Sequence, residues 1–307
     1  MPRLSVRQFL KNPGLTPADL AMVFLMREED DAKERSMPTM TVRELPEAVR
    51  NLESAGITAV KIFAGARLRD ARASQHASPT SLMARSVTAI KKAAPGMLVM
   101  TETCVCQHND SGECRLADKN GRMAVEETIE ALGIQAVMQA EAGADIVGPA
   151  AMIPGSVREI REVLDVSGHT NVGIVPHLIF ASSLYEGFRT SMGATPRSGV
   201  RAFQIPPNQP EQAMHIARQM VDEGADMILT EPALHTVDTL VHLKDKIPVP
   251  LVPFSVSGEF QRLTDPGEDG ERDVRPLVEA YTVLKRAGAT RIITYAALEM
   301  ARHLKVS

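Results

Sequence analysis

One pattern recurs four times along this chain and constrains its fold more than any other feature. In each copy a helical stretch ends in a small turn that contains glycine, and an uninterrupted apolar run follows; the glycines are Gly56, Gly143, Gly224 and Gly288. Glycine just past a helix supplies the left-handed residue that ends it. An apolar run without alternation is typical of a strand buried on both faces. The pattern therefore predicts alternating helices and strands with a parallel sheet.

Eight strands are predicted once the other apolar runs are added: Leu20–Met26, Thr58–Ala64, Met97–Thr101, Asp145–Pro149, Val172–Pro176, Asp226–Thr230, Val249–Phe254 and Arg291–Tyr295. Amphipathic helices are predicted between them: Val42–Ser54, Ser81–Ala93, Val125–Ala142, Val157–Val166, Pro210–Glu223, Thr239–Lys246 and Val274–Arg286. Since one (β/α)8 TIM barrel fills ~250 residues, the 307 residues predict a single-domain α/β barrel over 1–307. A doubly wound open sheet is the alternative, but the glycine-rich turn that often follows its first strand is missing after Met26.

Composition excludes several classes of partner. The chain has 34 Lys and Arg against 38 Asp and Glu, without a basic run, which argues against nucleic acid. No apolar stretch approaches the ~18 residues of a membrane span. The N-terminus lacks a charged-then-apolar leader, so we expect a cytoplasmic protein.

The three cysteines of the chain form a local cluster. Cys104, Cys106 and Cys114 lie within eleven residues with the spacing C-x-C-x7-C, after the third predicted strand. In a cytosolic protein this spacing favours a thiolate metal site, with Zn²⁺ as the metal and a fourth position open to water or substrate. An extended strand end would place Cys104 and Cys106 on one side. The alternatives are that these are unrelated loop thiols and that His108 is a fourth ligand.

Polar residues also follow other predicted strands, at the end of the barrel where function is located. Glu102, His177, Glu231, Ser257 and Tyr295 stand at such points. A polar, glycine-rich loop, Thr264–Asp273, follows the seventh strand and is either a lid or a solvated turn.

These residues and several further motifs resemble the porphobilinogen synthase (5-aminolevulinate dehydratase) family over nearly the whole chain. The cysteine segment Glu102–Cys114 resembles the segment that binds catalytic zinc in one branch of the family. Further segments resemble family motifs in the same order: Ser36–Pro38, Phe180–Arg189, Val200–Gln204, Val256–Phe260 and Ile293–Tyr295. The resemblance implies a homo-oligomer, here with a short N-terminal arm.

The resemblance also implies roles for individual residues. Cys104, Cys106 and Cys114 would bind Zn²⁺. Arg189, Arg201 and Gln204 fall in the segments that hold substrate, while Ser257 and Tyr295 would bind a substrate carboxylate.

The departures from the family pattern fall on its chemistry. The family uses two Schiff-base lysines, and their positions here are Ile179 and Glu231. Neither side chain can replace an amine nucleophile in imine chemistry. The segment Pro149–Gly155 also lacks two acids of the family motif. Of ten lysines, Lys61 alone lies within a predicted barrel strand. We expect it to be partly buried or paired with a barrel acid rather than to be a displaced Schiff-base lysine.

Three functions remain open. The first is a zinc-dependent lyase or condensing enzyme for a small amino or keto acid, without the Schiff-base route, in which Glu231 and His177 act as general base and acid. Glu102 would be a further proton-handling acid. The second is an authentic 5-aminolevulinate dehydratase of tetrapyrrole biosynthesis, and the third is a non-catalytic paralogue that binds metal or ligand.

Overall fold

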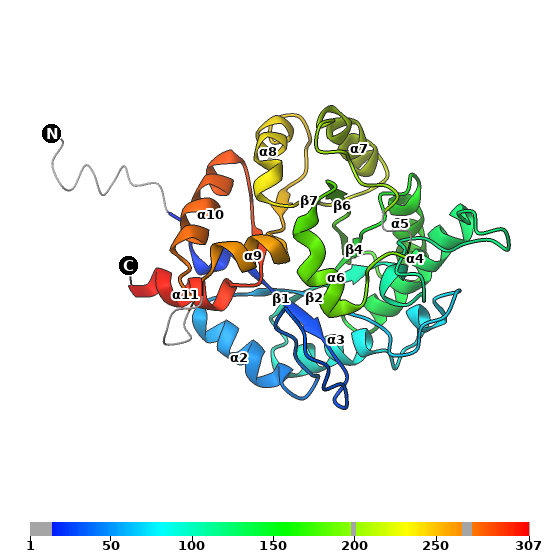
Figure 1. The fold of residues 1–307 in the computed structure, drawn as a ribbon, viewed down its shortest axis with the longest axis horizontal. Coiled ribbons are helices and arrows are strands. Elements are labelled where there is room, and N and C mark those ends of the chain that lie inside the picture. The colour runs from blue at the N-terminus through cyan, green and yellow to red at the C-terminus, as the bar shows by residue number, and fades with distance from the viewer. Residues whose placement is uncertain (1–13, 198–200, 266–271, 307) are drawn as a thin grey trace, which may run out of the picture.

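A computed structural model describes residues 14–197, 201–265 and 272–306. Its strands form the centre of the molecule and its helices surround them (Figure 1). The strands are β1 Leu20–Met26, β2 Ala59–Ala64, β3 Leu98–Thr103, β4 Ile146–Pro149, β5 Gly173–Ile174, β6 His177–Ile179, β7 Ile228–Glu231, β8 Leu251–Pro253 and β9 Ile292–Thr294. The helices are α2 Leu45–Ala55, α3 Leu82–Ala93, α4 Val125–Glu141, α5 Ser156–Val166, α6 Glu186–Met192, α7 Glu211–Asp222, α8 Val237–Leu243, α9 Ser257–Leu263, α10 Arg275–Ala287 and α11 Ala297–Val306.

The strands close into a barrel. Parallel pairing runs in the order β5-β4-β3-β2-β1-β9 and, separately, β6-β7-β8. A parallel bridge between Phe254 and Ile293 joins β8 to β9. The chain itself joins β5 to β6, because only Val175 and Pro176 separate them. The predicted TIM-barrel fold is thereby confirmed.

The fifth predicted strand is divided in two. Val175 N donates to Val147 O on β4, whereas Leu229 N of β7 donates to Pro176 O. The first half thus pairs with β4 and the second half with β7, and Pro176 at the change of partner has no N–H to donate. His177 therefore begins β6, although the sequence places it just after a strand.

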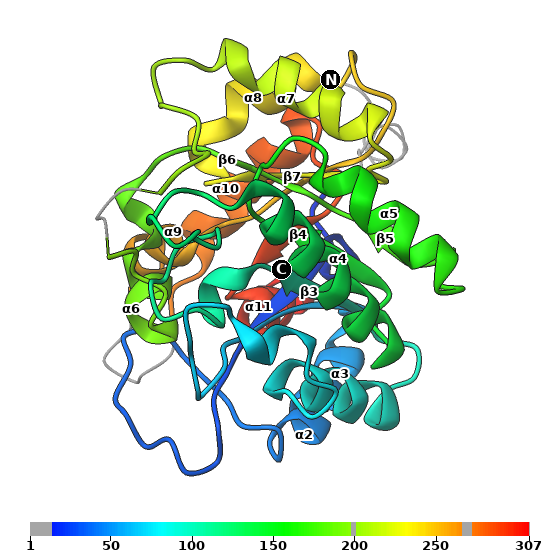
Figure 2. The same cartoon turned by 90° about the vertical axis from the view of Figure 1, so that its right-hand side faces the viewer.

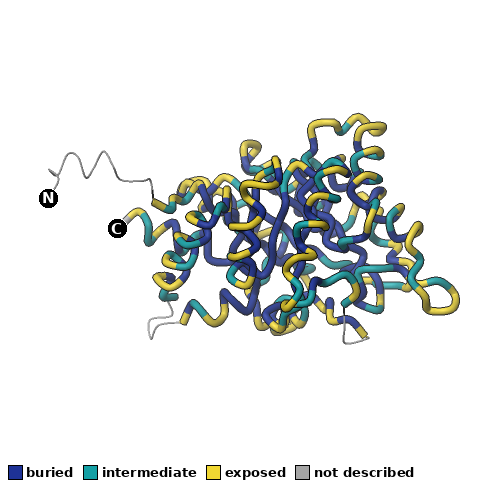
Figure 3. Tube along the Cα trace, turned by 90° about the horizontal axis from the view of Figure 1, so that it is seen from above, coloured by how far each residue is buried: buried dark blue, intermediate teal, exposed yellow. Residues whose placement is uncertain are grey.

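Helices cover the outside of the barrel and also its mouth. All seven predicted helices are present, as α2, α3, α4, α5, α7, α8 and α10. The sequence does not predict α6, α9 and α11. Of these, α6 and α9 lie side by side across one end of the barrel (Figures 1 and 2). The tube view shows the buried residues at the centre and the exposed ones on the outer helices and loops (Figure 3).

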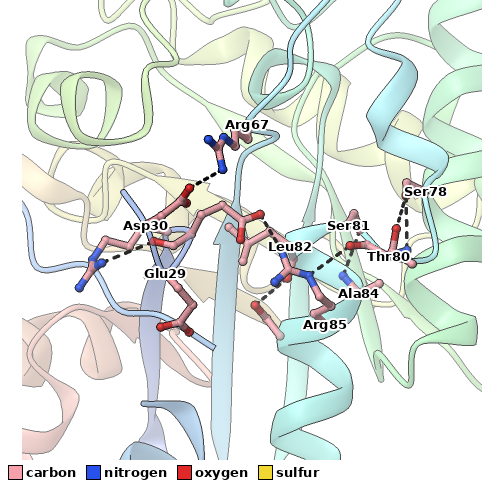
Figure 4. Close-up of polar contacts among 12 residues, drawn as sticks. Glu29, Asp30, Arg67, Ser78, Thr80, Ser81, Leu82, Ala84 and Arg85 are labelled. Carbon is pink, nitrogen blue, oxygen red and sulfur yellow. Dashed lines mark hydrogen bonds and ion pairs between the residues drawn. The ribbon is translucent and has the colours of Figure 1, made fainter. Parts of the chain in front are cut away.

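Ion pairs join the loops that follow β1 and β2. Arg67 Nη1 lies 2.5 Å from Asp30 Oδ2, and Arg85 Nη2 lies 2.5 Å from Glu28 Oε1. Helix α3 begins beside them, where the Ser81 hydroxyl accepts a hydrogen bond from Ala84 N (Figure 4). A serine in this position satisfies one of the free N–H groups of a helix N-terminus. The two loops and the start of α3 are therefore one connected unit.

Two sequence predictions concern residues that the structure does not describe. The predicted short N-terminal arm lies largely in residues 1–13, and the loop Thr264–Asp273 includes residues 266–271. Within the described residues, no helix combines the length and apolar character that crossing a membrane requires.

Candidate active site

A cavity at the carboxyl end of the barrel brings the predicted site residues together. Ten of the eleven predicted residues line it: Glu102, Cys106, Cys114, His177, Arg189, Arg201, Gln204, Glu231, Ser257 and Tyr295. The eleventh, Cys104, lies beside the other two thiols. Residues from β3, β6, β7, α6 and α9 thus share one site, as the closure of a barrel requires.

The cysteine cluster is built by short-range structure. Cys104 follows β3 in extended conformation, and a 3-10 turn over Val105–Gln107 then brings Cys106 back beside it. The prediction that strand alternation places these two thiols is therefore wrong in its geometry, although they do meet. In the following turn Asn109 Oδ1 accepts from Gly112 N at 2.8 Å, and Asn109 Nδ2 donates to Glu113 O at 2.7 Å. This turn returns Cys114 to the other two.

Gly112 is required by the approach of a second segment. Its φ is +70°, and a Cβ there would lie 2.4 Å from Thr195 O. A side chain at this position would push the cysteine loop away from the segment after α6.

The three thiols fit a metal ion. Their Sγ atoms all lie within 4.8 Å of one another. Hydrogen bonds from the thiols of Cys104 and Cys114 hold the pKa of Cys106 well below its usual range, and the nearby Arg201 guanidinium acts in the same direction. Three convergent sulfurs with one thiolate already favoured are a donor set for a soft divalent metal. His108 is not part of this group: its Nε2 lies 3.2 Å from Gln135 Nε2 on α4.

A second group of cavity residues is a buried imidazole flanked by two acids. His177 Nδ1 lies 2.9 Å from Glu231 Oε1, and its Nε2 lies 3.4 Å from Glu102 Oε2. The latter oxygen also lies 3.0 Å from Lys61 Nζ. The expected pairing of Lys61 with a barrel acid is confirmed. We call Lys61, Glu102, His177 and Glu231 the acid–imidazole chain.

Burial sets the protonation of this chain. It raises the pKa of Glu231 to about 7 and lowers that of His177 to about 3. His177 is therefore a neutral imidazole at neutral pH, and Glu231 exchanges a proton in that range. The 2.9 Å contact accordingly holds a proton between His177 and Glu231, which both line the cavity.

The two predicted arginines already have partners. Arg189 Nη1 pairs with Glu186 Oε1 at 2.9 Å, and its guanidinium lies 5.3 Å from the centre of the Tyr185 ring. Arg201 Nη1 donates to Cys114 Sγ at 2.5 Å, so this residue belongs to the thiol side of the cavity. Each guanidinium has five N–H donors and retains some for a ligand.

Ser257 and Tyr295 differ in what they can offer a ligand. The Ser257 hydroxyl donates to Leu184 O and accepts from Phe188 N, both at 3.0 Å. Its single proton is used within the protein, so it cannot also be donated to a carboxylate. The Tyr295 hydroxyl is buried and makes no hydrogen bond among the residues that the structure describes. It is the free donor of the pair.

The early motif Ser36–Pro38 supports the cavity by contacting α6. Met37 N donates to Ser191 Oγ at 3.0 Å, and Ser36 Oγ donates to Gly187 O at 3.3 Å. These bonds hold α6, the helix that carries Arg189, over the barrel.

Sequence reasoning missed the apolar wall of the cavity: Phe63, Ala150, Tyr185, Phe188, Phe254 and Val256. Tyr185, Phe188 and Val256 lie within segments that the family resemblance marks, whereas Phe63, Ala150 and Phe254 are indistinguishable from core residues in a single sequence. Ile179 and Glu231, at the ends of β6 and β7, line the cavity, and no lysine does so in the described part of the chain.

Comparisons with known proteins agree with the motifs. A sequence model of the family described as delta-aminolevulinic acid dehydratase matches residues 3–303. This chain belongs to that family. It is 33% identical to the delta-aminolevulinic acid dehydratase of Bacillus subtilis over 98% of this chain and 95% of the relative. It is 32% identical to that of Escherichia coli, over 97% and 94%.

A solved structure of a relative shares the fold. It is the delta-aminolevulinic acid dehydratase of Toxoplasma gondii in complex with its reaction product, porphobilinogen. Its TM-score is 0.90 at 30% identity, covering 98% of this chain and 89% of that one. The predicted family, a family of lyases named as dehydratases, is confirmed.

Proposed function

We propose that the protein is a zinc-dependent lyase or condensing enzyme that acts on a small amino or keto acid without forming an imine. The observation that carries this proposal is the composition of the cavity: it contains thiols, two acids and an imidazole, and no lysine is among its described lining residues. An imine route needs a primary amine at the substrate. By the family resemblance, Ile179 and Glu231 stand where such amines would be.

Each part of the cavity has a role in this proposal. Cys104, Cys106 and Cys114 would hold Zn²⁺, which supplies a Lewis acid able to polarise a carbonyl or hydroxyl oxygen. Glu231 takes a proton from the substrate, since its pKa of about 7 allows it to exchange protons at neutral pH. His177, which contacts both Glu231 and Glu102, stabilises that exchange.

The remaining residues bind the substrate. Arg189 and Arg201 would attract a carboxylate through their remaining donors, and the Tyr295 hydroxyl would donate to it. Gln204 adds an amide to the same wall. Ser257 contributes by holding Leu184 and Phe188 in place. The family resemblance further favours a homo-oligomer in which residues 1–307 are one unit.

Metal analysis of the purified protein tests the zinc-dependent proposal. We expect about one zinc per chain, and we expect Cys104→Ala to lose both the metal and the activity. A protein without stoichiometric zinc, or an active Cys104→Ala variant, would contradict the mechanism.

The second candidate is the activity printed in the relatives' names, and identities of 31–33% to several of them favour it. Incubation with 5-aminolevulinate followed by a colour test for a pyrrole decides between the two. We expect no pyrrole, because the family's amines are replaced. Pyrrole formation would establish the dehydratase activity instead.

A further inference from the structure

Lys61 is the most deeply buried charged side chain of the barrel. It lies on β2, its exposed fraction is 0%, and its Nζ contacts two partners: Glu102 Oε2 at 3.0 Å and Thr101 O at 3.3 Å. A third contact is the Phe63 ring, whose centre is 5.1 Å away. A cation buried to this degree is stable only with a counter-charge and polar partners around it.

The neighbouring strand leaves space for the ammonium and the imidazole together. Gly148, on β4, pairs with Glu102 on β3. A Cβ at Gly148 would lie 2.8 Å from Lys61 Nζ and 3.2 Å from His177 Nε2. Glycine is therefore the residue that lets the two nitrogen atoms approach the same point of the barrel interior.

Lys61 does not itself face the ligand. Phe63, two residues further along β2 and on the same face, lines the cavity, whereas Lys61 does not. Its ammonium lies one layer deeper, against Glu102 and the Phe63 ring, which line the cavity in its place. This excludes direct contact with a substrate and leaves an effect on its neighbours.

We propose that Lys61 is a positioning residue for the proposed acid–base reaction. Its ammonium holds the Glu102 carboxylate against His177 and thereby fixes the imidazole that contacts Glu231. The inference rests on the proposed function, because it assigns Lys61 a role only if Glu231 and His177 act on the substrate.

Lys61 is needed because the Glu102 carboxylate must be held on the Nε2 side of the His177 imidazole. Glu102 Oε2 makes no directed hydrogen bond among the described residues, so its charge contact with Lys61 is what holds it beside the neutral imidazole. Without the ammonium, this buried carboxylate would be unpaired and would turn away from its present position. That movement would remove the contact on the Nε2 side of His177.

Lys61→Met is the direct test, since methionine is of similar length, unbranched and uncharged. Lys91→Met is the matched control: Lys91 Nζ also contacts one carboxylate, Asp145 Oδ2 at 2.7 Å, and one carbonyl, Met97 O at 3.0 Å, but outside the barrel. Both variants are compared with the zinc-loaded wild type by nitrogen NMR of the histidine rings. The His177 signals are assigned with His177→Gln.

We expect Lys61→Met to shift the ring nitrogens of His177 and Lys91→Met to leave them unchanged. This readout needs no substrate. Unchanged His177 signals in folded Lys61→Met would overturn the inference whether or not the proposed function holds.

Steady-state kinetics test the catalytic consequence, with the substrate that turns over or with 5-aminolevulinate as the probe. We expect kcat to fall about 10²-fold in Lys61→Met with KM little changed, because small displacements of reacting groups cost about this much. A full kcat in Lys61→Met, beside a greatly reduced kcat in Glu231→Gln, would overturn the inference alone. A full kcat in Glu231→Gln would instead overturn the proposed function.

The double variant Lys61→Met/Glu102→Gln separates positioning from folding. Removing both charges avoids an unpaired buried carboxylate, so this variant should be more stable than Lys61→Met. Its kcat should equal that of Glu102→Gln alone, since Lys61 acts through Glu102. A further loss of kcat in the double variant would show an independent role and overturn the inference.

Discussion

The two sides of the cavity are built in different ways. On the thiol side, one segment of eleven residues supplies all three sulfurs, and tight turns bring them within 4.8 Å of one another. The acid–imidazole chain instead takes one residue from each of four strands, β2, β3, β6 and β7. The first arrangement is local, and the second exists only because the barrel closes.

This difference explains which parts of the site can be recognised as a sequence motif. A metal cluster in one segment is recognisable from its spacing, and it resembles the family pattern. The residues of the acid–imidazole chain come from separate strands and depend on tertiary structure, so no local spacing identifies them. The thiol side and the acid side should therefore respond separately to substitution.

The largest effect is expected on the thiol side. Cys106→Ser replaces the sulfur whose thiolate is most favoured, so the zinc should be lost and activity should fall by about 10³-fold or more, as losing several kcal/mol of stabilisation implies. Metal analysis and a turnover assay measure both. Val105→Ala, between two of the cysteines, is the control and should keep the metal.

On the acid side, Glu231→Gln should reduce kcat by about 10²–10⁴-fold, which is the usual value of a general acid or base. Its zinc content should equal that of the wild type. A loss of zinc in this variant would show that the two sides are not independent.

The same residue should produce a pH dependence. Because burial raises the pKa of Glu231 to about 7, kcat/KM should rise with pH up to about 7 as the carboxylate forms. Stability should change in the opposite direction. The folded state binds the proton more tightly than the unfolded state. As the pH rises from about 4.5 to 7, the free energy of unfolding therefore decreases by up to about 3 kcal/mol through this group. Unfolding in urea measures it.

Glu259, whose pKa burial also raises to about 7, adds to the same slope. Glu231→Gln should therefore reduce the slope but not remove it. An unchanged slope in that variant would contradict the assignment of Glu231 as a buried, titrating carboxyl.

The smallest effect is expected for Ser257→Ala. It leaves Leu184 O and Phe188 N without their partner, which should cost about 1–3 kcal/mol of stability. Since the Ser257 proton is used within the protein, KM should change less than in Tyr295→Phe. A larger rise in KM for Ser257→Ala would show that the serine binds the ligand directly.

The sequence predicts the barrel well and the inside of the site less well. Gly56, Gly143, Gly224 and Gly288 mark the ends of helices before four of the buried strands, and apolar runs mark the other four. Eight barrel positions therefore follow from short-range signals. The change of strand partner at Pro176, from β4 to β7, does not follow from such signals, because it depends on which strands flank the fifth one.

Lys61 shows the same limit. Its place in an apolar strand indicates a buried partner, but only the folded barrel shows that the partner is Glu102 and that His177 and Gly148 lie beside it. Ser257 is the opposite case. The motif indicates a ligand-binding serine, whereas its neighbours Leu184 and Phe188 use both of its hydrogen bonds.

Trapping with borohydride tests the central claim, that this member of the family acts without an imine, most directly. Zinc-loaded protein is incubated with isotopically labelled 5-aminolevulinate, reduced with borohydride and measured by intact mass spectrometry. We expect the protein to keep its unmodified mass, with no label on any lysine. A labelled, reduced adduct on a lysine would contradict it.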